Sequence, residues 1–197
     1  MNVSATSVAA LGTAGGPTPP GTVNAPFGIS EDWFNGVAQC GSEIKFHPTS
    51  TAGCAGWHNF DEGSHSASAI KSTIDGIADG SFVSPEIIPG VTQFTFSGGN
   101  IASAFPNLQA LYNQEAVAGD WYVTIPVYEA NGCANPSNMM TIVGYAKAKV
   151  TAILGPPAKT IKSEVQCDSF VNGAPPTGSG GVSGPGTPIS PYPRLVS

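Results

Sequence analysis

The residues best suited to chemistry are two histidines and two carboxylates close together in the chain: His58, Asp61, Glu62 and His65. His47 precedes them. Imidazole nitrogens and carboxylate oxygens can bind zinc or transfer protons. Their order, however, is not the His-Glu-x-x-His of a zinc-binding helix, and Gly63 indicates a loop. We therefore interpret the segment as a polar turn leading into a helix, and we predict neither a metal site nor a catalytic site.

Other motifs for chemistry are weaker. The loop after Glu129 carries Asn131, Asn135 and Asn138, whose oxygens could bind calcium. Calcium sites usually gather several carboxylates, and this loop has one. The sequence also has no Gly-x-Ser-x-Gly nucleophile turn and no phosphate-binding Gly-Lys loop. We expect a protein that is not an enzyme and uses no cofactor, with a secreted hydrolase as a second alternative.

The chain has an even number of cysteines, which are Cys40, Cys54, Cys133 and Cys167. No two of them have the close C-x-x-C spacing of zinc sites. An even number in a chain of low charge indicates two disulfides formed in an oxidising compartment. Sequence cannot decide the connectivity. Because the first two flank a short polar stretch and the last two bracket predicted strands, we favour 40–54 and 133–167.

Charge narrows the possible partners. Only 10% of the 197 residues are charged, against about 25% in an average domain. The net charge is −6 with 7 basic residues, which argues against nucleic acid because phosphate neutralisation needs clustered lysine and arginine. Lys147, Lys149, Lys159 and Lys162 follow one another in a β-rich region. We interpret them as a solvated edge that protects a sheet from stray pairing.

The chain shows no signal peptide and no apolar run of membrane-spanning length. A protein with disulfides but no export signal implies that a leader was removed or that an upstream anchor was left out of this chain. We therefore expect an extracytoplasmic location, at the cell surface, in the periplasm or secreted. Any membrane attachment would come only through an anchor helix missing from this chain.

The remaining pattern predicts an α+β fold. Its antiparallel sheet is mainly a C-terminal three-strand meander, 121–128, 141–154 and 160–167, joined by an N-terminal strand at 3–11. Shorter strands are expected at 43–46 and 91–96. Helical spacing predicts helices at 66–78, with Gly80 as a left-handed stop, and at 106–117. One or two short helices should cover the sheet, and disulfides should staple it.

Domain boundaries follow from composition. Residues 1–171 form the predicted extracytoplasmic domain, and residues 172–197 form a Gly/Pro/Ser-rich tail or linker. Within 172–193, 12 of 22 residues are glycine or proline, which cannot bury enough apolar surface to fold. Most aromatic side chains should lie in the core. Trp33 and Phe34 are the pair we consider as a possible interaction surface, for example for a glycan.

Several short sequence motifs carry a family resemblance. These are Pro-Phe-Gly-Ile at 26–29, Cys-Ala-Gly-Trp-His-Asn-Phe at 54–60, Trp-x-Val-x-x-Pro-Val-Tyr at 121–128 and Ile-Val-Gly-Tyr-Ala at 142–146. In this order the chain resembles the extracytoplasmic region of TadG-like proteins, associated with tight-adherence (Tad, Flp-type) pilus assembly. The resemblance implies a structural or interaction domain in pilus assembly or adhesion. Its partners would be other pilus or envelope proteins, or further copies of the chain. A secreted carbohydrate- or surface-binding module is the first alternative.

Overall fold

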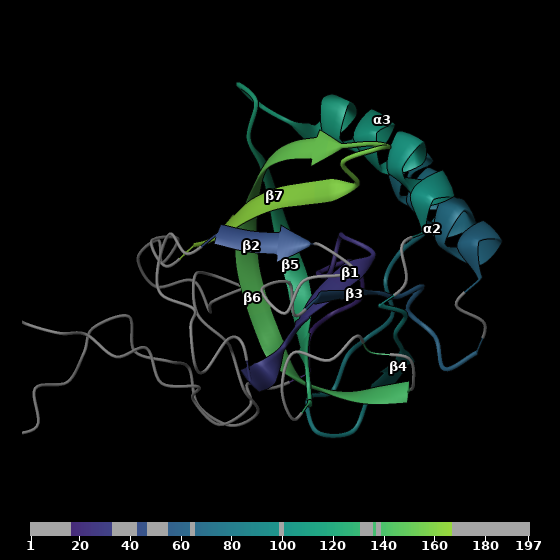
Figure 1. The fold of residues 1–197 in the computed structure, drawn as a ribbon. Coiled ribbons are helices and arrows are strands. Elements are labelled where there is room, and N and C mark those ends of the chain that lie inside the picture. Colours follow the sequence, from purple (N-terminus) through teal and green to yellow (C-terminus); the bar gives the residue numbers. More distant parts are fainter. Residues whose placement is uncertain are drawn as a thin grey trace, which may run out of the picture.

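The structure is a computed structural model that describes residues 17–32, 43–46, 55–63, 66–98, 101–130, 136 and 139–166. Figure 1 shows two helices packed against one side of a curved sheet. The elements are β1 (Phe27–Ser30), β2 (Glu43–Phe46), β3 (Ala55–Trp57), α2 (Ala67–Asp79), β4 (Gln93–Thr95), a 3₁₀ turn (Ala102–Ala104), α3 (Phe105–Glu115), β5 (Trp121–Tyr128), β6 (Met139–Leu154) and β7 (Thr160–Val165).

The strands form one sheet in the order β2-β7-β6-β5-β1-β3, and β4 pairs with the first residues of β6. The C-terminal meander β5-β6-β7 is antiparallel, as predicted. One pair is parallel: β1 runs alongside the end of β5, with Ile29 opposite Val127. The predicted mixed α+β class with a mostly antiparallel sheet is confirmed. The N-terminal strand that joins the meander here is β1, whereas the strand predicted at 3–11 lies outside the described residues.

The central strand β6 explains the position of the lysines. Buried Ala146, Ala148 and Val150 alternate along it with half-buried Lys147 and Lys149. Because β6 lies between β5 and β7, and β7 lies between β6 and β2, neither strand is at the edge of the sheet. The interpretation of these lysines as an edge guard is therefore wrong. Both backbone sides of β6 and β7 already have partners, so Lys147 and Lys149 project from a face of the sheet.

The helix α2 begins and ends close to the predicted positions, whereas α3 ends at Glu115, two residues before the predicted end at 117. The Ser66 hydroxyl accepts a hydrogen bond from the Ala69 N–H at 3.2 Å and caps α2. Gly80 ends α2 with a left-handed φ of 77°, a conformation that is strained in residues with a Cβ. Pro106 lies in the first turn of α3, where its missing N–H costs nothing. The two helices are tied together by the Gln114 side-chain amide, which donates to the Ala78 carbonyl at 2.7 Å.

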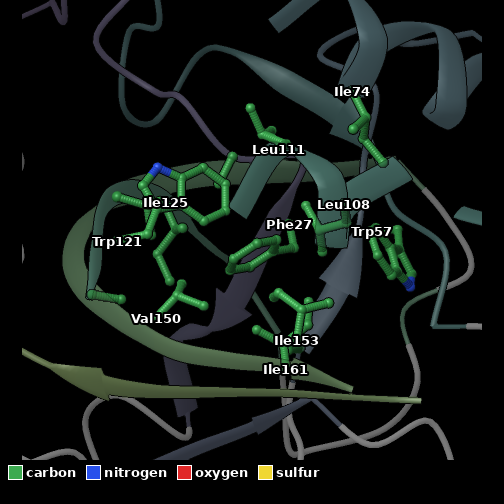
Figure 2. Packing of buried hydrophobic residues seen from close by; sticks show 14 of the residues in the cluster. Phe27, Trp57, Ile74, Leu108, Leu111, Trp121, Ile125, Val150, Ile153 and Ile161 are labelled. Atoms are coloured by element: carbon green, nitrogen blue, oxygen red, sulfur yellow. The ribbon is translucent and has the colours of Figure 1, made fainter. Parts of the chain in front are cut away.

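The main core fills the space between the helices and the inner face of the sheet. Figure 2 shows Leu108 of α3 beside Phe27 of β1, and Leu111 of the same helix belongs to the same core. The Trp57 indole meets the Phe105 ring edge to face, with centroids 5.5 Å apart. A second, smaller core lies toward β4 and consists of Val23, Phe60, Ile87, Phe94, Phe96, Tyr128, Ile142 and Tyr145. Burial of this apolar surface is the main driving force for the fold.

Several predicted features lie outside the described residues. They are the four cysteines, the Trp33–Phe34 pair and the tail 172–197. Stapling by disulfides is therefore not part of the fold that the structure shows. In the part of the chain that the structure describes, no helix is long and apolar enough to cross a bilayer.

Candidate functional site

The described residues of the histidine–carboxylate cluster at 58–65 lie in different surroundings: His58 is buried, and Asp61 is exposed. His58 follows β3, and its side chain is completely buried in the second core. Its ring stacks on Phe94 with centroids 5.2 Å apart, and it contacts the rings of Phe60 and Phe96 at 4.4 and 5.1 Å. A side chain surrounded by aromatic rings is not accessible to a substrate in solution. His58 is therefore a core residue.

The surroundings of His58 also decide its protonation. Neither ring nitrogen makes a hydrogen bond within the described structure. Burial penalises the charged form and lowers the pKa of His58 to about 3, and the neighbouring Phe27 backbone opposes this shift only in part. The imidazole is thus neutral at physiological pH. A neutral, enclosed imidazole is a poor general acid or base near neutral pH.

The Asp61 carboxylate of the cluster closes a turn. Asp61 accepts a hydrogen bond from the Gly63 N–H at 2.8 Å and another from the Asn59 side-chain amide at 3.3 Å. This closed turn agrees with the polar turn expected before α2. His65 and His47 lie outside the described residues. Among the residues described, no three histidine, cysteine, aspartate or glutamate side chains are grouped so that they could hold a metal ion.

The loop after Glu129, whose oxygens were considered for calcium and judged insufficient, lies almost wholly outside the described residues. Glu129 is exposed at the end of β5, and its N–H donates to the Thr141 carbonyl at 2.8 Å. Asn131, Asn135 and Asn138 lie outside the described residues. The loop therefore provides one described oxygen-bearing side chain.

An open polar depression of about 510 Å³ lies between α2 and the 3₁₀ turn, lined by Ser68, Lys71, Ser72, Asp75 and Ser103. Ligand sites are usually concave and largely apolar, with a few polar groups that orient the ligand. This depression has no aromatic floor, and its Asp75 carboxylate already accepts a hydrogen bond from the Asn107 amide at 2.6 Å. It is a weak candidate for ligand binding.

The outer face of β5, β6 and β7 is the better candidate. We call it the lysine face and define it by Tyr122, Lys147, Lys149, Lys162 and Glu164. The register places Tyr122 and Glu164 on either side of Lys149, and Lys162 lies two residues before Glu164 on the same side of β7. All five side chains therefore share the side of the sheet that faces away from the helices.

Contacts across the strands order part of this face. The Lys149 ammonium lies 3.2 Å from a Glu164 carboxylate oxygen and 3.9 Å from one of Asp120. The hydrogen bond to Glu164, with smaller help from Asp120, raises the pKa of Lys149. The Lys147 ammonium lies 5.8 Å from the centre of the Tyr122 ring, within range of a cation–π contact. Tyr122 is 51% exposed, so its ring is available to a partner.

Sequence reasoning found these lysines but placed them wrongly at an edge, and it expected most aromatic side chains in the core, whereas Tyr122 is exposed. The alternation of Tyr122, Lys147 and Lys149 with apolar residues was the available signal. The described tryptophans, Trp57 and Trp121, are both buried, as expected for most of the aromatic side chains. Comparisons of the chain with protein-family models, with curated proteins and with solved structures found no match.

Proposed function

We propose that this chain is a non-enzymatic interaction domain, and that it is the extracytoplasmic part of a TadG-like protein acting in pilus assembly or adhesion. The pilus assignment depends on the sequence resemblance described above. The observation that carries the interaction role is the lysine face, which presents an exposed tyrosine and a row of lysines. The partner would be another pilus or envelope protein, or a further copy of the chain.

The lysine face differs in charge from the rest of the molecule. Most of the basic residues lie in β2, β6 and β7 or in the turn before β7, and these are Lys45, Lys147, Lys149, Lys159 and Lys162. The chain as a whole is acidic, with a net charge of −6. A local basic surface on an acidic protein favours an acidic partner and disfavours partners with the opposite pattern. Tyrosine adds a large contact area at low entropic cost, as is common at interfaces.

The proposed role also includes two disulfides formed outside the cytoplasm. The resemblance and the even number of cysteines support them. An extracytoplasmic domain of low charge would gain stability from covalent crosslinks because they restrict the unfolded chain.

A test uses the whole gene in a bacterium that carries it. The chromosomal copy is replaced by a Lys147→Glu, Lys162→Glu variant, and surface pili and adhesion are counted. We expect fewer pili or weaker adhesion at an unchanged amount of folded protein. Lys71→Glu is the matched control, because Lys71 lies on α2 away from the lysine face.

Two results would count against the proposal. If deletion of the entire gene leaves pili and adhesion unchanged, the pilus role is wrong. If the variant and the Lys71→Glu control behave alike, the lysine face is not the interaction surface. Saturable glycan binding that is lost in Trp33→Ala would instead favour the carbohydrate-binding alternative.

A further inference from the structure

We infer that copies of this chain associate head to tail, with the helix layer of one copy docked on the lysine face of the next. The helix layer consists of α2, the 3₁₀ turn and α3. The inference rests on the proposed function, because it names a second copy of the chain as the partner of the lysine face. It adds the surface that this second copy presents and the symmetry of the contact.

The two surfaces lie on opposite sides of the sheet. The helices α2 and α3 cover one side, as Figure 1 shows, and Ala146, Ala148 and Val150 of β6 belong to the core beneath them. Lys147 and Lys149 alternate with these buried residues, so their side chains point away from the helices. A partner bound to the lysine face therefore leaves the helix layer of the same copy accessible.

The two surfaces carry opposite charge. Residues 139–165, from β6 to β7, contain four lysines and one glutamate. The helix layer contains three carboxylates, on Asp75, Asp79 and Glu115, and one lysine, Lys71. All three acidic residues are exposed, whereas Lys71 is half-buried. The molecule is therefore polarised, with a positive sheet face and a negative helix layer.

Two lysines of the lysine face have no carboxylate partner among the described residues. Lys149 forms ion pairs with Glu164 and Asp120, but the described structure gives none to Lys147 or Lys162. Lys162 is also exposed to solvent. Ammonium groups without a nearby carboxylate favour a surface that supplies carboxylates.

The carboxylates of α2 can supply that charge, because neither has an ion pair within the described residues. Asp75 accepts a hydrogen bond from the neutral side-chain amide of Asn107 at 2.6 Å. Asp79 accepts one from the Ser81 N–H at 2.9 Å. Hydrogen bonds from the Ser81 side chain and N–H lower the pKa of Asp79, so this carboxylate is ionised at neutral pH.

The two surfaces also correspond in shape. The helix layer contains the open polar depression described above, which is lined by Ser68, Ser72 and Ser103 together with Lys71 and Asp75. The lysine face presents an exposed tyrosine ring. A tyrosine hydroxyl both donates and accepts hydrogen bonds, and serine hydroxyls and a carboxylate are suitable partners for it. The depression is therefore suited to the tyrosine of a neighbouring copy.

Contact between two different surfaces of one chain has consequences for symmetry. Each added copy leaves one lysine face and one helix layer unoccupied. Such a heterologous contact closes into a ring if the rotation between copies allows it, and otherwise continues as a helical filament. A symmetric dimer would instead place lysines against lysines or acidic helices against acidic helices, and like charges facing each other are unfavourable. Charge therefore favours the head-to-tail arrangement.

The test is sedimentation velocity of the purified full chain at low ionic strength, where exposed charges are least screened. We expect the mean mass of the parent protein to rise with concentration up to about 1 mM, the weak end of specific affinities. Lys147→Gln with Lys162→Gln neutralises the lysine face, and Asp75→Asn with Asp79→Asn neutralises the helix layer. Each pair of substitutions should lower the association constant about tenfold, since an exposed ion pair contributes a factor of a few.

A mixture of the two variants distinguishes a head-to-tail contact from a symmetric one. The lysine-face variant keeps an intact helix layer, and the helix-layer variant keeps an intact lysine face. One matched pair of surfaces therefore remains, and the mixture should form dimers with one copy of each variant and nothing larger. If the helix-layer variant associates by itself as well as the parent does, the contact does not use the helix layer and the inference is wrong.

A charge-matched control is Glu62→Gln with Glu86→Gln. Both residues are exposed, and they lie before α2 and before β4, outside both surfaces. Because the net charge of the chain is −6, general repulsion alone would make the loss of any two carboxylates strengthen association. The head-to-tail contact predicts the opposite for Asp75 and Asp79. Equal behaviour of the control and the helix-layer variant would overturn the inference.

The remaining outcomes separate this inference from the proposed function. A parent protein that stays monomeric over the whole concentration range would overturn the head-to-tail contact. If deletion of the gene still abolishes pili or adhesion in that case, the proposed function stands with a different acidic partner. Association of the purified protein together with unchanged pili and adhesion after deletion would support the contact and overturn the pilus role.

Discussion

Gly28 of β1 and Gly56 of β3 lie directly opposite each other, and the Phe96 ring lies against both. A Cβ on Gly28 would be 3.1 Å from Phe96 Cε1, and one on Gly56 would be 3.1 Å from Phe96 Cδ1. The missing side chains therefore make room for an aromatic ring of the second core. This glycine pair is the point where the sheet and the second core meet.

Gly28→Ala should destabilise the protein. The added methyl would be 2.6 Å from the Pro126 carbonyl oxygen, which is part of β5 and cannot turn away. Overpacking of this kind typically costs about 1–3 kcal/mol. We expect the midpoint of urea denaturation to fall accordingly, with an unchanged slope.

Gly155→Ala is the control for that substitution. Gly155 lies in the turn after β6, and a Cβ there meets nothing within 4 Å. Its stability should stay within about 0.5 kcal/mol of the parent protein. Equal losses for Gly28→Ala and Gly155→Ala would mean that crowding at the glycine pair is not the cause.

His58 should make stability depend on pH. Its pKa is about 3 in the folded protein and 6.5 as a model value, so the unfolded state binds the proton more readily. The stabilisation is fully present above pH 6.5 and is lost as the pH falls toward 3. Between pH 6.5 and 3, each unit by which the pH falls should lower the free energy of unfolding by about 1.4 kcal/mol, because only the unfolded state readily binds a proton at His58.

The measurement is urea denaturation of the parent and of His58→Phe from neutral to acid pH. The phenylalanine ring keeps the aromatic packing but cannot be protonated. We expect the difference in stability between the two proteins to change with pH in favour of the variant in acid. A constant difference across that range would show that His58 is not the group responsible.

Tyr112→Phe should weaken the attachment of α3 to the sheet. The Tyr112 hydroxyl lies 2.9 Å from the Thr151 carbonyl oxygen and also contacts the Gly119 carbonyl oxygen. Loss of this donor should cost about 1 kcal/mol, measured by thermal or urea denaturation. Tyr122→Phe serves as the comparison, since Tyr122 is 51% exposed and should tolerate the change.

Gly80→Ala should shorten or strain the end of α2. Gly80 has a φ of 77°, and its N–H donates to the Ile77 carbonyl at 3.3 Å. Since no atom lies within 4 Å of a Cβ built there, the cost is conformational and should be about 1 kcal/mol. Gly80→Asn should recover part of this loss because asparagine adopts the left-handed conformation more easily. Equal stability of the alanine and asparagine variants would contradict this explanation.

The candidate surface shows where local pattern was insufficient. Lysines at alternate positions indicate the solvent side of a strand, and that much was predictable for Lys147 and Lys149. Whether their strand is central or at an edge depends on pairing with residues far along the chain. The burial of His58 was equally hidden, because its three aromatic neighbours come partly from the distant segment 94–96.

The sequence by itself determined the elements whose signals are local. The predicted helix 66–78 and its glycine stop became α2, and the predicted strand 121–128 is β5 with the same bounds. Helical periodicity, capping and β-branched alternation act within a few residues, so they can be read directly from the chain.

Only the tertiary structure determined that the short segments β1 and β3 are strands. β1 and β3 have four and three residues without alternation, and Phe27 to Ser30 are all buried. They are strands because β5 and each other supply their hydrogen bonds, including the parallel pair that was not foreseen. The parallel pairing joins residues about a hundred positions apart, and its energy depends on a register that no local pattern contains.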